Sequence, residues 1–84
     1  MKKVWLLNHQ DRTLIGEYET FKECNEAINK KIESMGIDHR YDRYWYEHDL
    51  VVIDFGSWTK FFEVEGASSM EEYFNAITSS EENI

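Results

Sequence analysis

The sequence predicts a small α+β domain of the order ββαβββα, with one mostly antiparallel sheet and two helices packed on one face of it. Three observations predict this class. The 84 residues are 42% hydrophobic and 15% aromatic, which is enough for one core and one domain. Aromatic and β-branched runs alternate with turn residues, as in antiparallel strands. Two helix-start motifs precede apolar residues spaced by three or four.

The chain opens with a predicted hairpin. Residues 4–8 have the composition of a strand, residues 10–12 are predicted to turn, and residues 13–18 form the partner strand. Gly16 either weakens that second strand or marks a β-bulge in it. We expect residues 1–78 to form the single domain and residues 79–84 to be a frayed acidic tail.

The first helix has the clearest signals in the chain. Thr20 and Glu23 match a capping box, in which each side chain accepts a hydrogen bond from the other residue's backbone amide. Gly36 is placed to adopt the left-handed conformation that ends a helix. The apolar residues in between draw one stripe along the helix: Phe21, Cys24, Ile28, Ile32 and Met35.

Residues 41–65 are predicted to form three antiparallel strands, with turns at 48–49 and 56–59. A two-residue turn fixes the register of the first two strands, and closing the second turn aligns the third. The first pairing is Glu47 with Leu50, Tyr46 with Val51, Trp45 with Val52, Tyr44 with Ile53 and Arg43 with Asp54. The second is Asp54 with Phe61, Ile53 with Phe62, Val52 with Glu63, Val51 with Val64 and Leu50 with Glu65. One side of this sheet is apolar or aromatic, and we expect it to be the core face: Tyr44, Tyr46, Val51, Ile53, Phe62 and Val64.

A second capping box, Ser69 and Glu72, predicts a short C-terminal helix. Its apolar residues at helical spacing are expected to cover more of the sheet: Met70, Tyr73, Phe74 and Ile77.

The other side of the sheet combines aromatic and acidic residues. The formal net charge is −8, and residues 61–84 carry six acidic residues and no basic one. The predicted register leaves four carboxylates on this side, opposed only by Arg43. The candidate partner-binding residues are therefore Trp45, Glu47, Asp54, Phe61, Glu63 and Glu65. Two interpretations fit: an ordinary solvated face with an Arg43–Asp54 pair, or a binding surface with aromatic anchors inside an acidic rim.

The sequence predicts no catalytic residue, no metal site and no cofactor. Asp54-Phe55-Gly56 matches the metal-binding triplet of protein kinases, but a chain this short lacks that family's other motifs. Cys24 lies on the helical apolar stripe and is predicted to pack in the core. The basic and aromatic residues of 39–46 are typical of single-stranded nucleic-acid binding, but the net charge opposes it, so we expect no direct nucleic-acid contact.

The sequence shows neither a signal peptide nor a membrane-spanning segment, and this bears on the cellular compartment of the protein. The initial apolar run has four residues, too few for a signal-peptide core, and no stretch reaches the roughly 20 apolar residues that span a bilayer. The single cysteine has no intrachain partner. We therefore expect a cytoplasmic protein that does not associate with membranes.

The short acidic chain, residues 17–21 and the block of residues 53–62 resemble small accessory proteins encoded by phages and mobile elements of Gram-positive bacteria. This resemblance implies a non-enzymatic host-takeover or anti-defence role in the bacterial host cell, including inhibition of the anti-CRISPR type.

The leading hypothesis is therefore a protein-binding inhibitor that mimics nucleic acid. Its carboxylates would occupy a basic nucleic-acid-binding surface, for example on a CRISPR nuclease complex. The alternative is a homodimeric structural or adaptor domain that uses the open sheet face as its own interface.

Overall fold

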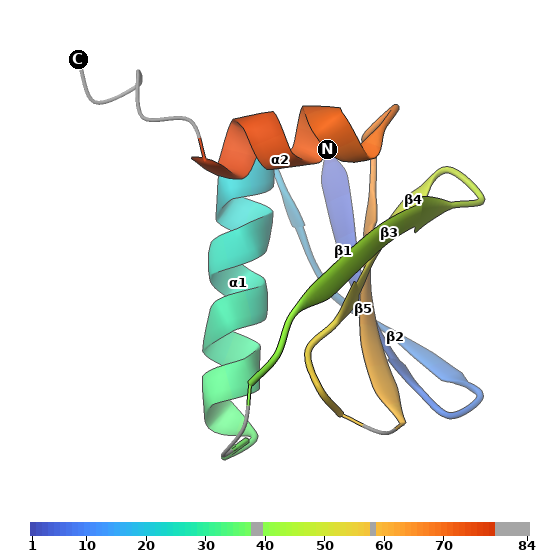
Figure 1. Ribbon diagram of the computed structural model, residues 1–84, viewed down its shortest axis with the longest axis vertical. Coiled ribbons are helices and arrows are strands. Elements are labelled where there is room, and N and C mark those ends of the chain that lie inside the picture. The colour runs from blue at the N-terminus through green and yellow to red at the C-terminus, as the bar shows by residue number, and fades with distance from the viewer. Residues whose placement is uncertain (38–39, 58, 79–84) are drawn as a thin grey trace.

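The computed structural model describes residues 1–37, 40–57 and 59–78. The predicted tail at 79–84 and parts of the predicted 39–46 segment and 56–59 turn lie outside these residues. The elements follow the predicted order, ββαβββα (Figure 1). They are β1 (Lys2–Asn8), β2 (Asp11–Tyr18), α1 (Phe21–Ser34), β3 (Arg43–Glu47), β4 (Leu50–Asp54), β5 (Lys60–Glu65) and α2 (Met70–Thr78).

The five strands form one antiparallel sheet in the order β2-β1-β5-β4-β3. The first hairpin is therefore joined to the last three strands through β5, which lies between β1 and β4. This junction pairs Val4 with Val64 and Leu6 with Phe62 on the side that faces the helices. This junction was not predicted from the sequence, because no turn connects β1 to β5.

The first hairpin turns one residue earlier than predicted. Asn8 pairs with Asp11, so the turn is formed by His9 and Gln10, and His9 has a φ of 61°. The pairing register between β1 and β2 shifts by one residue between Val4, which pairs with Gly16, and Trp5, which pairs with Leu14. The bulge that Gly16 suggested is therefore present.

The register predicted for the last three strands is confirmed over both ladders. All five pairs between β3 and β4 occur, and four of the five between β4 and β5. The exception is Asp54 with Phe61, because the β4–β5 ladder ends at the pair of Ile53 with Phe62. The His48-Asp49 turn has positive φ at both residues, 53° and 63°, as a type I′ hairpin turn requires.

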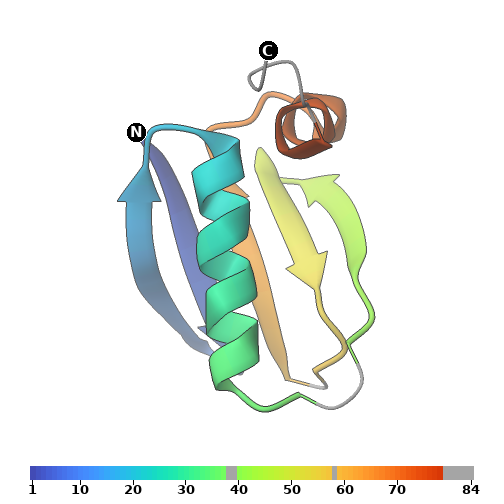
Figure 2. The same ribbon diagram turned by 90° about the vertical axis from the view of Figure 1, so that its left-hand side faces the viewer.

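Both helices lie on the same side of the sheet (Figures 1 and 2). Helix α1 begins after Thr20 with the predicted capping box, and Gly36 follows it with a φ of 68°. Four residues of the α1 stripe are buried: Phe21, Cys24, Ile28 and Ile32. Helix α2 packs against α1 and β3 (Figure 2).

Helix α2 completes the core through Tyr73. This side chain is fully buried, and its hydroxyl donates to Asn25 Oδ1 at 3.3 Å. The rings of Tyr73 and Phe21 meet edge to face, with their centroids 5.6 Å apart. The second capping box differs from the predicted one. Ser69 Oγ accepts from the Glu72 amide at 3.0 Å as expected, but Glu72 accepts from the amide and hydroxyl of Ser68.

Candidate protein-binding face

No helix of the described residues covers the second side of the sheet, which we call the open face (Figure 1). Its members follow from the alternation of side chains along each strand. All six predicted binding residues belong to it. Together with the residues added by β1 and β2, the open face consists of Lys3, Trp5, Leu7, Arg12, Leu14, Glu17, Arg43, Trp45, Glu47, Leu50, Val52, Asp54, Phe61, Glu63 and Glu65.

Four of the predicted residues surround one depression, which we call the aromatic hollow. It has a volume of about 190 Å³ and is lined by Leu7, Trp45, Glu47, Val52, Phe61 and Glu63. The Trp45 and Phe61 rings meet edge to face, with centroids 6.1 Å apart. The floor is Val52, which is only 6% exposed although no helix covers it. The hollow therefore has apolar walls and floor and a carboxylate on each side.

The charges of the open face differ from the prediction. Glu63 and Glu65 were predicted to be opposed only by Arg43, and this prediction is wrong. Since β1 joins β5, strand β2 brings Arg12 over the same face, where it pairs with Glu63 at 2.9 Å and with Glu65 at 3.3 Å.

Arg12 also lies over the ring of Trp5, 3.9 Å from its centroid, and the Trp5 indole N–H donates to Glu65. These contacts make a cluster of one cation, one indole and two carboxylates beside the hollow. Lys3 on β1 is paired across the ladder with Glu65. The open face is thus less acidic than predicted, because the first hairpin adds two basic residues, Lys3 and Arg12, and only one carboxylate, Glu17.

The other two predicted carboxylates differ in accessibility. Asp54 accepts from Arg43 at 3.0 Å, as predicted, and its side chain is 14% exposed. This hydrogen bond raises the pKa of Arg43 above its ordinary value, so the guanidinium stays charged. Glu47 accepts from the Trp45 indole N–H and keeps 54% of its side chain exposed. Glu47 and Glu65, at 38%, are the most accessible of the four predicted carboxylates.

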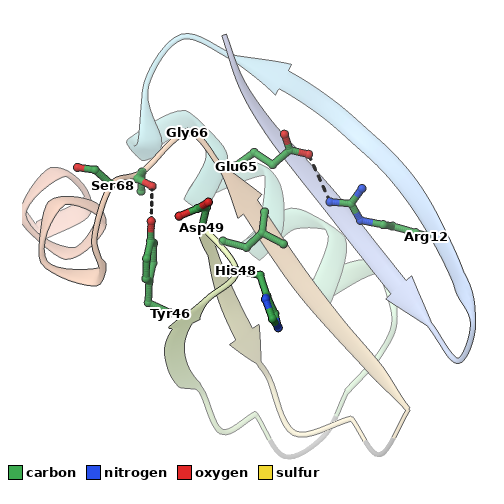
Figure 3. Close-up of a pocket in the computed structure, with 9 residues that line it drawn as sticks. Arg12, Tyr46, His48, Asp49, Glu65, Gly66 and Ser68 are labelled. Atoms are coloured by element: carbon green, nitrogen blue, oxygen red, sulfur yellow. Dashed lines mark hydrogen bonds and ion pairs between the residues drawn. The ribbon is translucent and has the colours of Figure 1, made fainter.

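A wider groove adjoins the open face beside the His48-Asp49 turn (Figure 3). Its volume is about 610 Å³, and it separates that turn from the connection between β5 and α2. Tyr46 donates from its hydroxyl to the Ala67 carbonyl at 2.9 Å, on the opposite side of the groove from Arg12 and Glu65. These polar groups already have partners within the chain. The groove therefore extends the open face toward the His48-Asp49 turn.

Cys24 is fully buried, as the helical stripe predicted, and burial raises its pKa to about 11. Ser57 Oγ accepts from the amides of Thr59 and Lys60, so this hydroxyl closes a turn. In residues 1–37, 40–57 and 59–78, no three His, Cys, Asp or Glu side chains lie close enough together to hold a metal ion. Over the same residues, neither helix combines the length and apolar character that crossing a bilayer requires.

Trp5, Leu7 and Arg12 belong to the open face but were not predicted from the sequence. Their signal was present, because Trp5 and Leu7 alternate with Val4 and Leu6 in the first strand. It became useful only with the strand order, since the first hairpin reaches this face through β5. Comparison of the chain with protein-family models, with curated proteins and with solved structures finds no match.

Proposed function

We propose that the protein is a non-enzymatic, protein-binding inhibitor or modulator whose open face occupies a basic, nucleic-acid-binding site on a bacterial protein, for example a nuclease complex. The observation that carries this proposal is the aromatic hollow, an uncovered apolar depression with Glu47 and Glu63 on its rim. Aromatic residues in a partly desolvated depression with polar residues around it are the usual composition of a protein-binding hot spot.

The shape and charge of the hollow favour a long basic side chain. Trp45 and Phe61 offer ring surface to an aliphatic stem or a guanidinium plane, while the rim carboxylates offer hydrogen-bond acceptors to its charged end. A protein surface that binds nucleic acid is rich in lysine and arginine. The hollow is therefore complementary to one arginine or lysine of such a surface.

The net charge of −8 supports the same class of partner at long range. An acidic protein is attracted toward a basic surface before contact, which raises the association rate at low ionic strength. Because Arg12 already offsets Glu63 and Glu65, the close contacts rest more on the aromatic hollow and Glu47 than on a phosphate-like row of carboxylates. The resemblance of residues 53–62 to phage accessory proteins is the ground for a bacterial target and for action in the bacterial cytoplasm.

The first experiment is affinity capture from bacterial lysate with the tagged protein, with and without nuclease treatment and at low and high salt. We expect capture of a nucleic-acid-binding protein that survives nuclease treatment and weakens at high salt. The captured protein is then purified, and its affinity is measured for the wild type, Trp45→Ala and Phe61→Ala. Each substitution should weaken binding by at least about tenfold, and excess nucleic acid should compete.

Glu33→Ala, on the exposed side of α1, is the matched control and should bind like the wild type. The proposal is wrong if no nucleic-acid-binding protein is captured independently of nucleic acid. It is equally wrong if folded Trp45→Ala and Phe61→Ala bind the captured protein as tightly as the wild type does. If the tagged protein captures only further copies of itself, and Phe61→Ala abolishes this capture, the result would favour the homodimeric adaptor that uses the open face as its interface.

A further inference from the structure

Strand β3 forms one edge of the sheet, and β2 forms the other (Figure 2). Within the described residues β3 pairs with β4 alone, so one row of its backbone N–H and C=O groups faces outward. Proteins commonly block such an edge with proline, lysine or a bulge. The β2 edge has a bulge next to Gly16, whereas β3 has none of these devices and consists of Arg43, Tyr44, Trp45, Tyr46 and Glu47.

The hairpin turn determines which backbone groups face outward. In a pair closed by a two-residue turn, the residues flanking the turn exchange both hydrogen bonds, and the bonded pairs then alternate along the ladder. Glu47, next to the turn, therefore bonds to β4, and so do Trp45 and Arg43. The N–H and C=O groups of Tyr44 and Tyr46 are directed to the open edge.

We propose that two copies of this chain associate through antiparallel pairing of their β3 edges about a two-fold axis at Trp45. In this register Tyr44 of one copy lies opposite Tyr46 of the other, so the outward backbone groups of both can exchange hydrogen bonds at two symmetric places. The two five-stranded sheets become one continuous sheet of ten strands.

Charge and side-chain pairing favour this register. The strand has a cation at one end and a carboxylate at the other, so the two-fold axis places Arg43 opposite Glu47 of the second copy, twice. Both side chains are accessible, with exposures of 62% for Arg43 and 54% for Glu47. Two aromatic cross-strand pairs join the tyrosines on the helix side, and the two Trp45 side chains lie together on the open face.

This pairing leaves the open face uncovered and goes beyond the function proposed above. The two aromatic hollows of a dimer would lie on the same side of one sheet, next to the junction, because both contain Trp45. Two linked hollows would engage two basic side chains of one extended partner surface. A five-residue edge is a small interface, so the association is weak and depends on concentration.

Sedimentation equilibrium over a concentration series up to about 1 mM tests the pairing. The variants are Arg43→Glu and Glu47→Arg, each of which places like charges opposite each other at both ends of the edge. We expect each alone to weaken dimerisation by about tenfold or more. An equimolar mixture of the two should recover it, because every facing pair in the mixed dimer is then opposite in charge.

Lys30→Glu and Glu33→Arg on α1 are the matched controls, since they change the net charge by the same amounts away from the edge. They should dimerise like the wild type. A strict monomer at the highest concentration overturns the proposal. So does dimerisation that ignores the edge charges, or a mixture that fails to recover it. A dimer lost on Phe61→Ala but kept by the edge variants would assign the contact to the open face instead.

Hydrogen exchange provides a second readout at residue level. The amides of Tyr44 and Tyr46 should become protected as concentration rises, while the amide of Trp45, bonded to β4, stays protected throughout. If the protection of the Tyr44 and Tyr46 amides does not rise with concentration, the edge pairing is contradicted. This pairing is tested by dimerisation of the edge variants, and the proposed function by partner binding of Trp45→Ala and Phe61→Ala, so failure of one is distinguishable from failure of the other.

Discussion

At the scale of single residues, Arg12 changes the interpretation of the open face most. It offsets two carboxylates that the sequence analysis counted as free, and it covers the ring of Trp5. Its guanidinium occupies the place beside both carboxylates where the proposed function would put a basic residue of the partner. The charge that these acidic residues present therefore depends on a residue of a different hairpin.

Replacing Arg12 by glutamine should strengthen binding to a basic partner. The substitution leaves Glu63 and Glu65 without their cation, so we expect several-fold tighter binding at low salt and a steeper salt dependence. Because the pair is partly solvated, the free energy of unfolding should change by less than about 1 kcal/mol. Arg40→Gln is the matched control, since Arg40 pairs with Asp42 off the open face. Weaker binding of Arg12→Gln would mean that Arg12 itself contacts the partner.

Cys24 predicts how stability depends on pH. Its pKa is raised to about 11 by burial, so the folded state keeps the thiol protonated while the unfolded state ionises near the ordinary value of 9.0. The unfolded state therefore binds fewer protons above that value, and stability falls as pH rises toward 11. The ionisation of Cys24 lowers the free energy of unfolding by at most about 1.4 kcal/mol per pH unit.

Urea unfolding, followed by tryptophan fluorescence at about pH 8 and about pH 10, measures this loss. Tyr73, whose pKa is also raised by burial, adds to the loss at the alkaline end. Cys24→Ala should show a smaller loss of stability between the two pH values than the wild type. Rapid reaction of Cys24 with a thiol reagent in the folded protein at neutral pH would contradict the burial of this side chain.

At the scale of elements, each helix depends on a hydroxyl at its start. Thr20→Ala removes the acceptor for the Glu23 amide and should lower the free energy of unfolding by about 1 kcal/mol. Thr20→Ser keeps a hydroxyl and should retain most of the stability. Chemical denaturation of the three proteins measures the difference, and equal stability of Thr20→Ala and the wild type would show that the cap contributes nothing.

Strand β3 is held to the β5–α2 connection by one hydrogen bond. The Tyr46 hydroxyl donates to the Ala67 carbonyl at 2.9 Å in a partly buried position. Tyr46→Phe keeps the ring and loses this bond, so we expect a cost of about 1 kcal/mol in unfolding free energy. Hydrogen exchange should become faster in β3 and remain unchanged in β1. Unchanged exchange in β3 would mean that the hydrogen bond does not hold this edge strand.

The elements could be predicted from sequence because their determinants are local. The Thr20–Glu23 capping box and the His48-Asp49 turn act within a few residues, and the turn fixes the register of the strands it joins. The pairing of β1 with β5 could not be predicted in the same way. It joins residues about sixty positions apart, such as Trp5 and Glu63, with no turn to fix their alignment. The membership of Arg12 in the open face was missed for that reason.

At the scale of the whole molecule, the two sides of the sheet differ: the helices cover one side, and the open face remains exposed to solvent. The helices bury one side of the sheet and supply the core, through residues such as Ile28 and Tyr73. The open face keeps the aromatic hollow in contact with solvent, where exposed aromatic surface is costly unless a partner covers it. The proposed inhibitor function explains why the sheet remains uncovered on that side.

Hydroxyl-radical footprinting of the complex with the captured partner, compared with the free protein, tests that function most directly. It reads side-chain accessibility over the whole chain. We expect Trp45 and Phe61 to become several-fold less reactive in the complex, while exposed side chains of α1, such as Lys30 and Glu33, react as before. Protection of α1 with unchanged reactivity at Trp45 and Phe61 would contradict the assignment of the open face as the binding surface.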